Sequence, residues 1–185
     1  MKQFILIAAI LFMSVVNAVS QERYFTRNGK IYFLSDTPME KIDAKNSQGT
    51  SVFDAKTGQF EFAVLMKAFE FEKALMMEHF HENYVESDKY PKSVFKGTIT
   101  DITTVNLAKD GVYPVNYAGA LTLHGVTKDI TGKGTFTVKE GKVMGHSDFT
   151  ILLADYKIDI PSLVKDKVSK EVKIVVDAAY DKMQK

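Results

Sequence analysis

Two short stretches hold the residues of this sequence that are best suited to chemistry. His79 and His81 form a His-x-His pair flanked by Glu78 and Glu82, and His124 stands alone in "GALTLHGVTKDI". Imidazole and carboxylate groups at close spacing are common ligands of zinc and copper. Two histidines at this spacing share one face of a strand but diverge by about 200° on a helix. The pair therefore predicts a metal site only where its backbone is extended.

The stretch around the pair, "FEKALMMEHFHENY" at residues 71–84, has the apolar spacing of a helix. Met76, Phe80 and Tyr84 recur at every fourth position and form one stripe. On this helix the two histidines point apart, so we predict no metal site and no metal cofactor here. A metal-linked or redox role through the pair is kept as an alternative function.

Sequence features of an enzyme are missing. The chain has no cysteine, which excludes a thiol nucleophile, a disulfide framework and lipid attachment through cysteine. It has no Gly-x-Ser-x-Gly elbow, no phosphate-binding glycine loop and no His-Glu-x-x-His motif. His146 and Asp148 make a poor metal site, and scattered carboxylates such as Asp101 and Asp110 form no defined pair. We therefore predict that the protein is not an enzyme.

The N-terminus resembles a secretory signal peptide. A positive start, "MK", precedes an apolar run over residues 4–16, and "VNA" at residues 16–18 has the small residues of a cleavage site. The run is shorter than the about 20 residues of a membrane helix. We therefore expect a signal peptide at residues 1–18 and one mature domain at residues 19–185. That domain would lie in the periplasm or outside the cell, without stable insertion into a membrane.

The charge of the chain argues against several classes of partner. The full chain has 24 basic and 23 acidic residues, and residues 1–18 contain one of the lysines, so the mature domain is formally neutral. Nucleic-acid binding usually needs a basic face, and strong attraction to anionic membranes needs excess positive charge. We therefore expect no nucleic-acid partner. The sequence leaves open whether two copies form a homodimer.

The mature domain alternates between apolar and polar residues over most of its length, which is the pattern of strands with one buried face. One pair of strands flanks "KEGK", a tight turn in which we expect a positive φ at Gly141. About eight strands and one short helix predict an all-β fold, an eight-stranded antiparallel barrel whose closure leaves no edge strand. The alternating segments lie at residues 28–36, 52–60, 58–71, 93–102, 116–125, 132–153 and 171–180.

A barrel of about eight strands either fills with side chains or holds one small ligand. The residues expected to face inward are mostly phenylalanine and methionine, which form adaptable apolar walls. Because aromatic strands most often belong to an ordinary core, this pattern alone favours a filled barrel that uses its surface for interactions. A tunnel for an apolar chain is the alternative.

Two motifs carry a resemblance to a known family. The first is "LTLHGVTK" at residues 121–128, and the second is "KYPKSVF" at residues 89–95, which follows the helix that carries His79. In this order and spacing they resemble the YceI-like polyisoprenoid-binding family, over roughly residues 25–180. The resemblance implies a lipocalin-like barrel whose apolar tunnel holds a long isoprenoid chain in a secreted or periplasmic protein. It reverses the preference for a filled barrel.

The sequence departs from the family pattern at several points. Asp129 stands where the family usually has a proline, and Phe80 and His81 follow the helix histidine where leucine and a basic residue are common. The stretch up to Tyr90 is one residue shorter than usual, and the first strand lacks a histidine near its start. No contact with a ligand head group is therefore assigned.

From this resemblance we expect a protein that holds a long apolar lipid, polyisoprenoid or quinone-like, in its tunnel without another cofactor. Burial of the lipid drives binding, at about 0.8 kcal/mol for each methylene removed from water. The alternatives are the filled barrel and the metal-linked role through His79 and His81. The residues expected to contact the lipid are Phe60, Phe62, Val64, Met66, Phe69, Phe71, Met76, Met77, Phe80, Tyr84, Phe95, Leu121, Leu123, Phe136 and Phe149.

His124 is expected to serve the structure rather than the ligand. Leu121 and Leu123 fall on one face of their strand, and His124 falls on the other. The histidine ends the strand, and Gly125 frees the backbone to turn. We therefore predict that its ring makes hydrogen bonds near the turn and does not line the tunnel.

Overall fold

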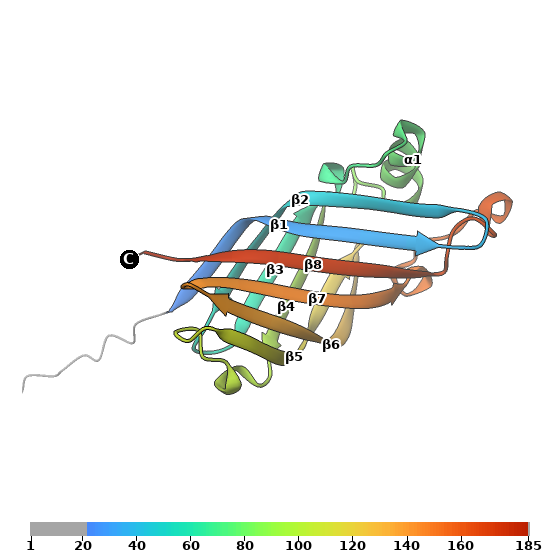
Figure 1. The fold of residues 1–185 in the computed structure, drawn as a ribbon. Helices are drawn as coiled ribbons and strands as arrows, with labels where there is room; N and C mark the ends of the chain where they lie inside the picture. The colour runs from blue at the N-terminus through green and yellow to red at the C-terminus, as the bar shows by residue number, and fades with distance from the viewer. Residues whose placement is uncertain (1–21, 185) are drawn as a thin grey trace, which may run out of the picture.

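The computed structural model of the chain describes residues 22–184, so the predicted signal peptide at residues 1–18 lies outside the described residues. The described chain forms one sheet in which each strand is antiparallel to the next. The last strand pairs with the first and closes the sheet into a barrel (Figure 1). The predicted fold class, an eight-stranded antiparallel barrel with one short helix, is confirmed.

Eight strands and several short helical turns make up the described chain. The strands are β1 (Arg23–Asp36), β2 (Lys41–Asp54), β3 (Gln59–Leu65), β4 (Lys92–Ile99), β5 (Gly111–Leu123), β6 (Val126–Lys139), β7 (Lys142–Leu152) and β8 (Glu171–Lys182). The helical elements are α1 (Ala74–His79), the π-helical turn η2 (Phe80–Tyr84) and the 3-10 turns η1 (Met66–Ala68), η3 (Ile102–Thr104), η4 (Leu153–Tyr156) and η5 (Ser162–Val164).

The connections gather at the two ends of the barrel because successive strands run in opposite directions. The cap end carries the β1–β2 and β5–β6 turns, the β3–β4 connection at residues 66–91 and the β7–β8 connection at residues 153–170. We call residues 66–91, which include α1, the cap segment. The base end carries the other turns and both ends of the described chain, as the position of the C-terminus in Figure 1 shows.

Tight turns at both ends use the backbone geometry that hairpins favour. His124 and Gly125 join β5 to β6 with φ values of 50° and 71°, and Glu140 and Gly141 join β6 to β7 with 51° and 76°. Two successive positive φ values match the right-handed twist of the flanking strands. The positive φ predicted at Gly141 is confirmed.

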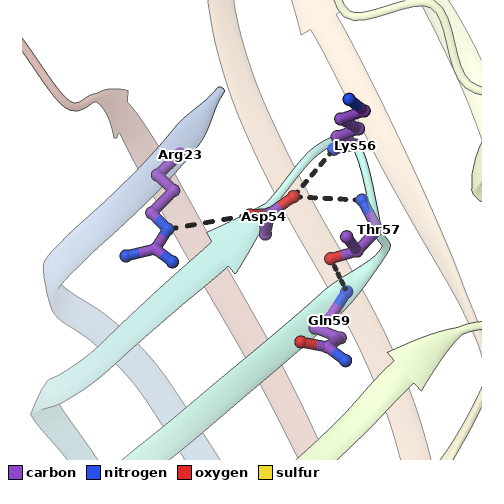
Figure 2. Close-up of polar contacts among 5 residues, drawn as sticks. All are labelled: Arg23, Asp54, Lys56, Thr57 and Gln59. Carbon is purple, nitrogen blue, oxygen red and sulfur yellow. Dashed lines mark hydrogen bonds and ion pairs between the residues drawn. The ribbon is translucent and has the colours of Figure 1, made fainter. Parts of the chain in front are cut away.

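The β2–β3 turn at the base end is held by the side chain of Asp54 (Figure 2). Its Oδ1 atom accepts hydrogen bonds from the backbone N–H groups of Lys56 and Thr57, both at 3.0 Å. Its Oδ2 atom lies 3.6 Å from Nε of Arg23 on β1. The hydroxyl of Thr57 in turn accepts from the backbone N–H of Gln59 at 3.3 Å. An aspartate followed by such backbone donors is a common way to fix a turn.

Two elements differ from the sequence-based expectation. The strand expected over residues 58–71 ends at Leu65, and the chain then enters the 3-10 turn η1 at the start of the cap segment. The helix expected over residues 71–84 is α-helical only in α1 and continues as the wider π-helical turn η2. The apolar spacing continues in both segments. Phe69 and Phe71 after β3, and Phe80 and Tyr84 of η2, still face the barrel interior.

Strands β6 and β7 pair over only part of their lengths. Their register runs from Lys139 and Lys142 at the turn to Gly134 and Ser147, and the first half of β6 has no pairing with β7. The 3-10 turn η4 contacts both strands beyond this point, and its Tyr156 is only 2% exposed. The barrel wall is therefore completed by a helical turn where the two strands part.

Candidate ligand-binding cavity

An internal cavity of about 360 Å³ lies inside the barrel. All of the predicted contact residues except Met77 line it, both those predicted on strands and those predicted on the helix stripe. Met77 is 37% exposed and does not line the cavity. Whether the others touch a ligand remains a prediction. The predicted residues that line the cavity are Phe60, Phe62, Val64, Met66, Phe69, Phe71, Met76, Phe80, Tyr84, Phe95, Leu121, Leu123, Phe136 and Phe149.

Other lining residues were not predicted from the sequence. Phe33 on β1 and Ile174 on β8 lie within alternating segments, so their spacing alone could have identified them. Ile158 and Val168 belong to the irregular β7–β8 connection, where no periodic pattern marks an inward position. Most of the unpredicted lining residues lie on strands, and a smaller group lies in the β7–β8 connection, which the sequence pattern could not place.

Phe62 lies over two glycines that face each other across β1 and β2. Gly29 and Gly49 are register partners. A Cβ atom added at Gly29 would lie 2.7 Å from Cζ of Phe62, and one added at Gly49 would lie 2.8 Å from the same atom. The ring thus occupies the space that two side chains would otherwise fill, an arrangement that glycines in strands permit.

Phe95 repeats the arrangement on the opposite side of β3. Gly97 and Gly119 are register partners on β4 and β5, and Cβ atoms added there would lie 2.5 Å and 2.7 Å from the Phe95 ring. Both phenylalanine rings therefore rest against the barrel wall. Space along the barrel axis stays open for this reason.

The base end of the cavity is bounded by aromatic rings. The ring centroid of Phe53 lies 5.1 Å from that of Phe136 and 6.1 Å from that of Tyr180. The hydroxyl groups of Tyr180 and Ser51 are hydrogen-bonded at 3.0 Å. Burial raises the pKa of Tyr180, and the hydrogen bond to Ser51 acts in the opposite direction. The phenol stays protonated and holds its ring in place.

The cap end is closed by a second aromatic group. The ring of Phe33 on β1 has Phe69, Phe71 and Phe80 of the cap segment around it, at centroid distances of 5.6, 5.7 and 5.4 Å. Such contacts are favourable beyond the area that they bury. These rings pack the cap segment against β1 of the barrel.

The carboxylate and ammonium groups that line the cavity lie at the cap end. Among the lining residues, the only carboxylate and the only ammonium group are those of Glu40 on the β1–β2 turn and Lys167 on the β7–β8 connection. Glu40 also pairs with Lys73 of the cap segment at 3.7 Å. Tyr84 lines the same region, and burial raises the pKa of its phenol. This end can accommodate a polar group of a ligand. The rest of the wall is mainly apolar, with the polar side chains of Thr135, His146 and Ser147 near the point where β6 and β7 part.

The two candidate metal ligands have different surroundings. His79 lines the cavity, and its Nδ1 atom accepts a hydrogen bond from the Asn83 amide at 3.1 Å. His81 does not line it, and its Nδ1 atom is buried without a hydrogen-bond partner among the described residues. Burial, reinforced by Lys67, lowers the pKa of His81, and Asp88 opposes this shift. Residues 22–184 contain no group of three or more histidine, aspartate and glutamate side chains placed to hold a metal ion.

His124 lies at the β5–β6 turn and does not line the cavity. Its Nδ1 atom lies 3.0 Å from the carbonyl oxygen of Tyr156 in η4, and its Nε2 atom lies 2.8 Å from Oε2 of Glu86 in the cap segment. The ring of Tyr90 packs edge-on against the imidazole at 4.8 Å. The structure thus places His124 as the sequence predicted, away from the cavity and hydrogen-bonded at the turn.

The helices of residues 22–184 are all too short or too polar to cross a bilayer.

Several solved structures are similar to this chain at 14% sequence identity, a level at which the similarity shows the fold alone. A polyisoprenoid-binding domain from Saccharophagus degradans has a TM-score of 0.77, with 88% of this chain and 99% of that chain covered. BcnA from Burkholderia cenocepacia has a TM-score of 0.68, with 83% and 96% covered. A YceI protein from Campylobacter jejuni has a TM-score of 0.55, with both chains fully covered. No curated protein matches the sequence.

The match to a protein family is extensive. The YceI-like domain family matches residues 27–180, which include all eight strands apart from the outermost residues of β1 and β8. This range agrees with the resemblance found from the two sequence motifs, which is confirmed. The chain therefore belongs to the YceI-like domain family.

Proposed function

We propose that this protein binds a long apolar lipid, of isoprenoid or quinone-like type, inside its barrel. The observation that carries the proposal is the internal cavity of about 360 Å³ with an aromatic and aliphatic wall. Its volume lies within the range of about 300–1,000 Å³ that is usual for small-molecule sites. The charged lining groups of Glu40 and Lys167 lie at one end, where they suit the polar end of such a lipid.

Burial of apolar surface supplies the driving force. Each isoprene unit of about five carbons contributes about 4 kcal/mol when it leaves water. Association itself costs about 4–15 kcal/mol, so a single unit does not bind and several units are needed. Affinity for a chain-like lipid therefore rises steeply with chain length.

The family relationship supports the isoprenoid class of ligand. One structurally similar protein, from Saccharophagus degradans, is described as a polyisoprenoid-binding domain. The signal-like N-terminal sequence supports a location in the periplasm or outside the cell. We propose that the protein binds or carries its lipid there without catalysis. Association of two copies remains a prediction, and native mass spectrometry measures it in the experiment below.

The test is to isolate the protein from its own host and identify any lipid by native mass spectrometry and organic extraction. Ile174→Trp places a large side chain into the cavity, whereas Lys173→Trp places it on the adjacent, outward position of β8. We expect an apolar lipid with the wild type and with Lys173→Trp, and none with Ile174→Trp. Recovery of no lipid from folded wild-type protein, together with no binding of added prenyl alcohols, would contradict the proposal.

A further inference from the structure

The two ends of the cavity differ in a way that fixes how a chain can lie in it. At the base end, Phe53 and Tyr180 line the cavity, whereas Tyr24 and Val143, their register partners on β1 and β7, belong to the same core cluster and do not line it. Tyr24 is 6% exposed and Val143 is 1% exposed. Ile102, Val105 and Leu107 of the β4–β5 connection at the base end pack against this cluster without lining the cavity, so the cavity is blind at this end.

The rings that bound the blind end are held from several sides. Phe53 is completely buried and is stacked on Phe136 with an angle of 27° between the rings. Its other face meets Tyr24 at a centroid distance of 6.2 Å, and Tyr180 is fixed by its hydrogen bond to Ser51. A ring packed in this way cannot move aside without opening a void in the base-end core. The end of the cavity is a rigid boundary.

The cap end has the opposite character. It is closed by the cap segment rather than by strands, and it carries the charged lining groups Glu40 and Lys167. A polar end group is costly to bury against aromatic rings but can be satisfied beside charged and solvated side chains. A lipid with one polar end therefore fits in one direction only.

We propose that the cavity takes a linear chain tail first and that the base-end rings of Phe53, Phe136 and Tyr180 limit the length of chain that it accepts. This inference rests on the proposed function and adds a chain-length limit and an orientation to it. Each isoprene unit raises the affinity by at least about tenfold while it can still be buried. Once the tail contacts the base-end rings, further units remain outside the cavity and add little.

The length limit is tested with a series of all-trans prenyl alcohols from geraniol to solanesol, measured by competition against tritiated farnesol. For the wild type we expect affinity to rise with length and then level off. Phe136→Ala removes a ring from the base end and should move the levelling point to a longer alcohol by about one isoprene unit, since a comparable engineered cavity holds a benzene ring. Ala178→Leu adds bulk beside the base-end rings and should move the levelling point to a shorter alcohol.

The matched control is Phe149→Ala, which removes an identical ring from the cavity wall on β7, further from the base-end rings. It should change affinity without moving the levelling point. Circular dichroism and thermal unfolding establish that each variant is folded, and Phe136→Leu replaces Phe136→Ala if the alanine variant is not. An unmoved levelling point in a folded Phe136 variant, or an equal shift in Phe149→Ala, would overturn the length limit.

Orientation is tested with two farnesol derivatives that carry a pyrene group at opposite ends. Pyrene at the hydroxyl end should be tolerated, and pyrene at the terminal isoprene unit should reduce affinity by at least about a hundredfold, because the tail can no longer reach the blind end. The reverse order of affinities would overturn the orientation. Failure of every prenyl alcohol to bind the wild type would instead reject the proposed function itself.

Discussion

The Nε2 atom of His124 lies 2.8 Å from Oε2 of Glu86 and joins the β5–β6 turn to the cap segment. Nδ1 of the same ring lies 3.0 Å from the carbonyl oxygen of Tyr156. The carbonyl oxygen of Tyr156 can only accept, so Nδ1 donates to it. The imidazole is only 12% exposed. His124 thus connects three loops of the cap end, which explains why the two family motifs lie together in space.

Replacement of His124 by asparagine should destabilise the protein by about 1–3 kcal/mol. Asparagine tolerates the positive φ of this position, but its shorter side chain leaves the buried carbonyl of Tyr156 without its donor. Urea unfolding measures the change. The control is His146→Asn, because His146 pairs with Asp177 at 2.7 Å in a pair that is more than half exposed. Such a pair is worth about 0–1 kcal/mol, and equal losses in the two variants would contradict the role assigned to His124.

Gly29→Ala should push the Phe62 ring off the barrel wall and into the cavity. The added Cβ atom would meet that ring at 2.7 Å, and such overpacking costs about 1–3 kcal/mol. We expect lower stability in urea and weaker binding of farnesol. The double variant Gly29→Ala with Phe62→Leu should recover part of the lost stability and part of the lost farnesol affinity, because the smaller leucine side chain leaves room for the added methyl group. Strictly additive effects in this double-mutant cycle would contradict the steric explanation.

Asp54 should make stability depend on pH in the acid range. Backbone donation from Thr57, then from Lys56, lowers the pKa of Asp54 below its ordinary value of 3.8, with Arg23 adding to the effect. The folded protein therefore binds this proton less readily than the unfolded chain. The stabilisation is complete above the unfolded pKa of about 4 and is lost as the pH falls through the lower folded pKa.

Asp54→Asn provides the test, because asparagine keeps an acceptor oxygen for the turn (Figure 2) and does not titrate. At neutral pH the variant should be less stable than the wild type by about 0.5–1.5 kcal/mol. The difference should shrink as urea unfolding is repeated at pH values descending to about 3. A difference that stays constant over this range would show that the charge of Asp54 contributes nothing.

His81 should make the cap segment less stable below neutral pH. Burial, reinforced by Lys67, lowers the pKa of His81 from 6.5, while Asp88 acts in the opposite direction. Because the unfolded segment takes up the proton more readily, stability is present above pH 6.5 and is lost as the pH falls through the lowered folded pKa. Hydrogen exchange in residues 66–91 should therefore be faster at about pH 5.5 than at 7.5, after correction for intrinsic rates.

The variant His81→Leu should remove most of this pH dependence, since leucine fills the site without a titrating group. His79→Leu in the same segment is the matched control, because the His79 ring already has a hydrogen-bond partner in Asn83. Its pH dependence should resemble that of the wild type. An unchanged profile in His81→Leu would assign the effect to another group.

The alternating pattern was sufficient to predict the barrel where each strand places apolar residues inward. Leu121 and Leu123 of β5 are both buried, as their spacing indicates. The stripe of Met76, Phe80 and Tyr84 faces the cavity even though its second half is a π-helical turn. Local periodicity is enough in these cases, because burial of one face decides the structure.

Strand β2 could not be fully predicted, because the inward positions in its middle are small or polar. Asn46 is 1% exposed and its side-chain amide donates to the carbonyl of Leu65 at 3.0 Å. Ser51 is likewise buried and bonded to Tyr180. The Asn46 amide and the Ser51 hydroxyl both need partners on other strands, so no local pattern identifies their positions as inward.

The choice between a filled barrel and a hollow one was also beyond the sequence pattern. The same phenylalanines would serve in either case. The barrel is hollow because the Phe62 and Phe95 rings lie over glycine pairs at the wall. Those glycine pairs can be recognised only when the strand register is known. The family resemblance, rather than the composition, favoured the hollow barrel at the level of sequence.

The position of the chain ends at the base of the barrel has a practical consequence. Glu22 and Gln184, the first and last described residues, leave the barrel at the end opposite the cap segment. An affinity handle or sensor-chip linker placed beside either end of the described residues should therefore leave the cap end facing solution. Immobilised protein prepared in this way presents every copy in the same orientation, with the cap segment accessible to lipid vesicles or to a partner protein.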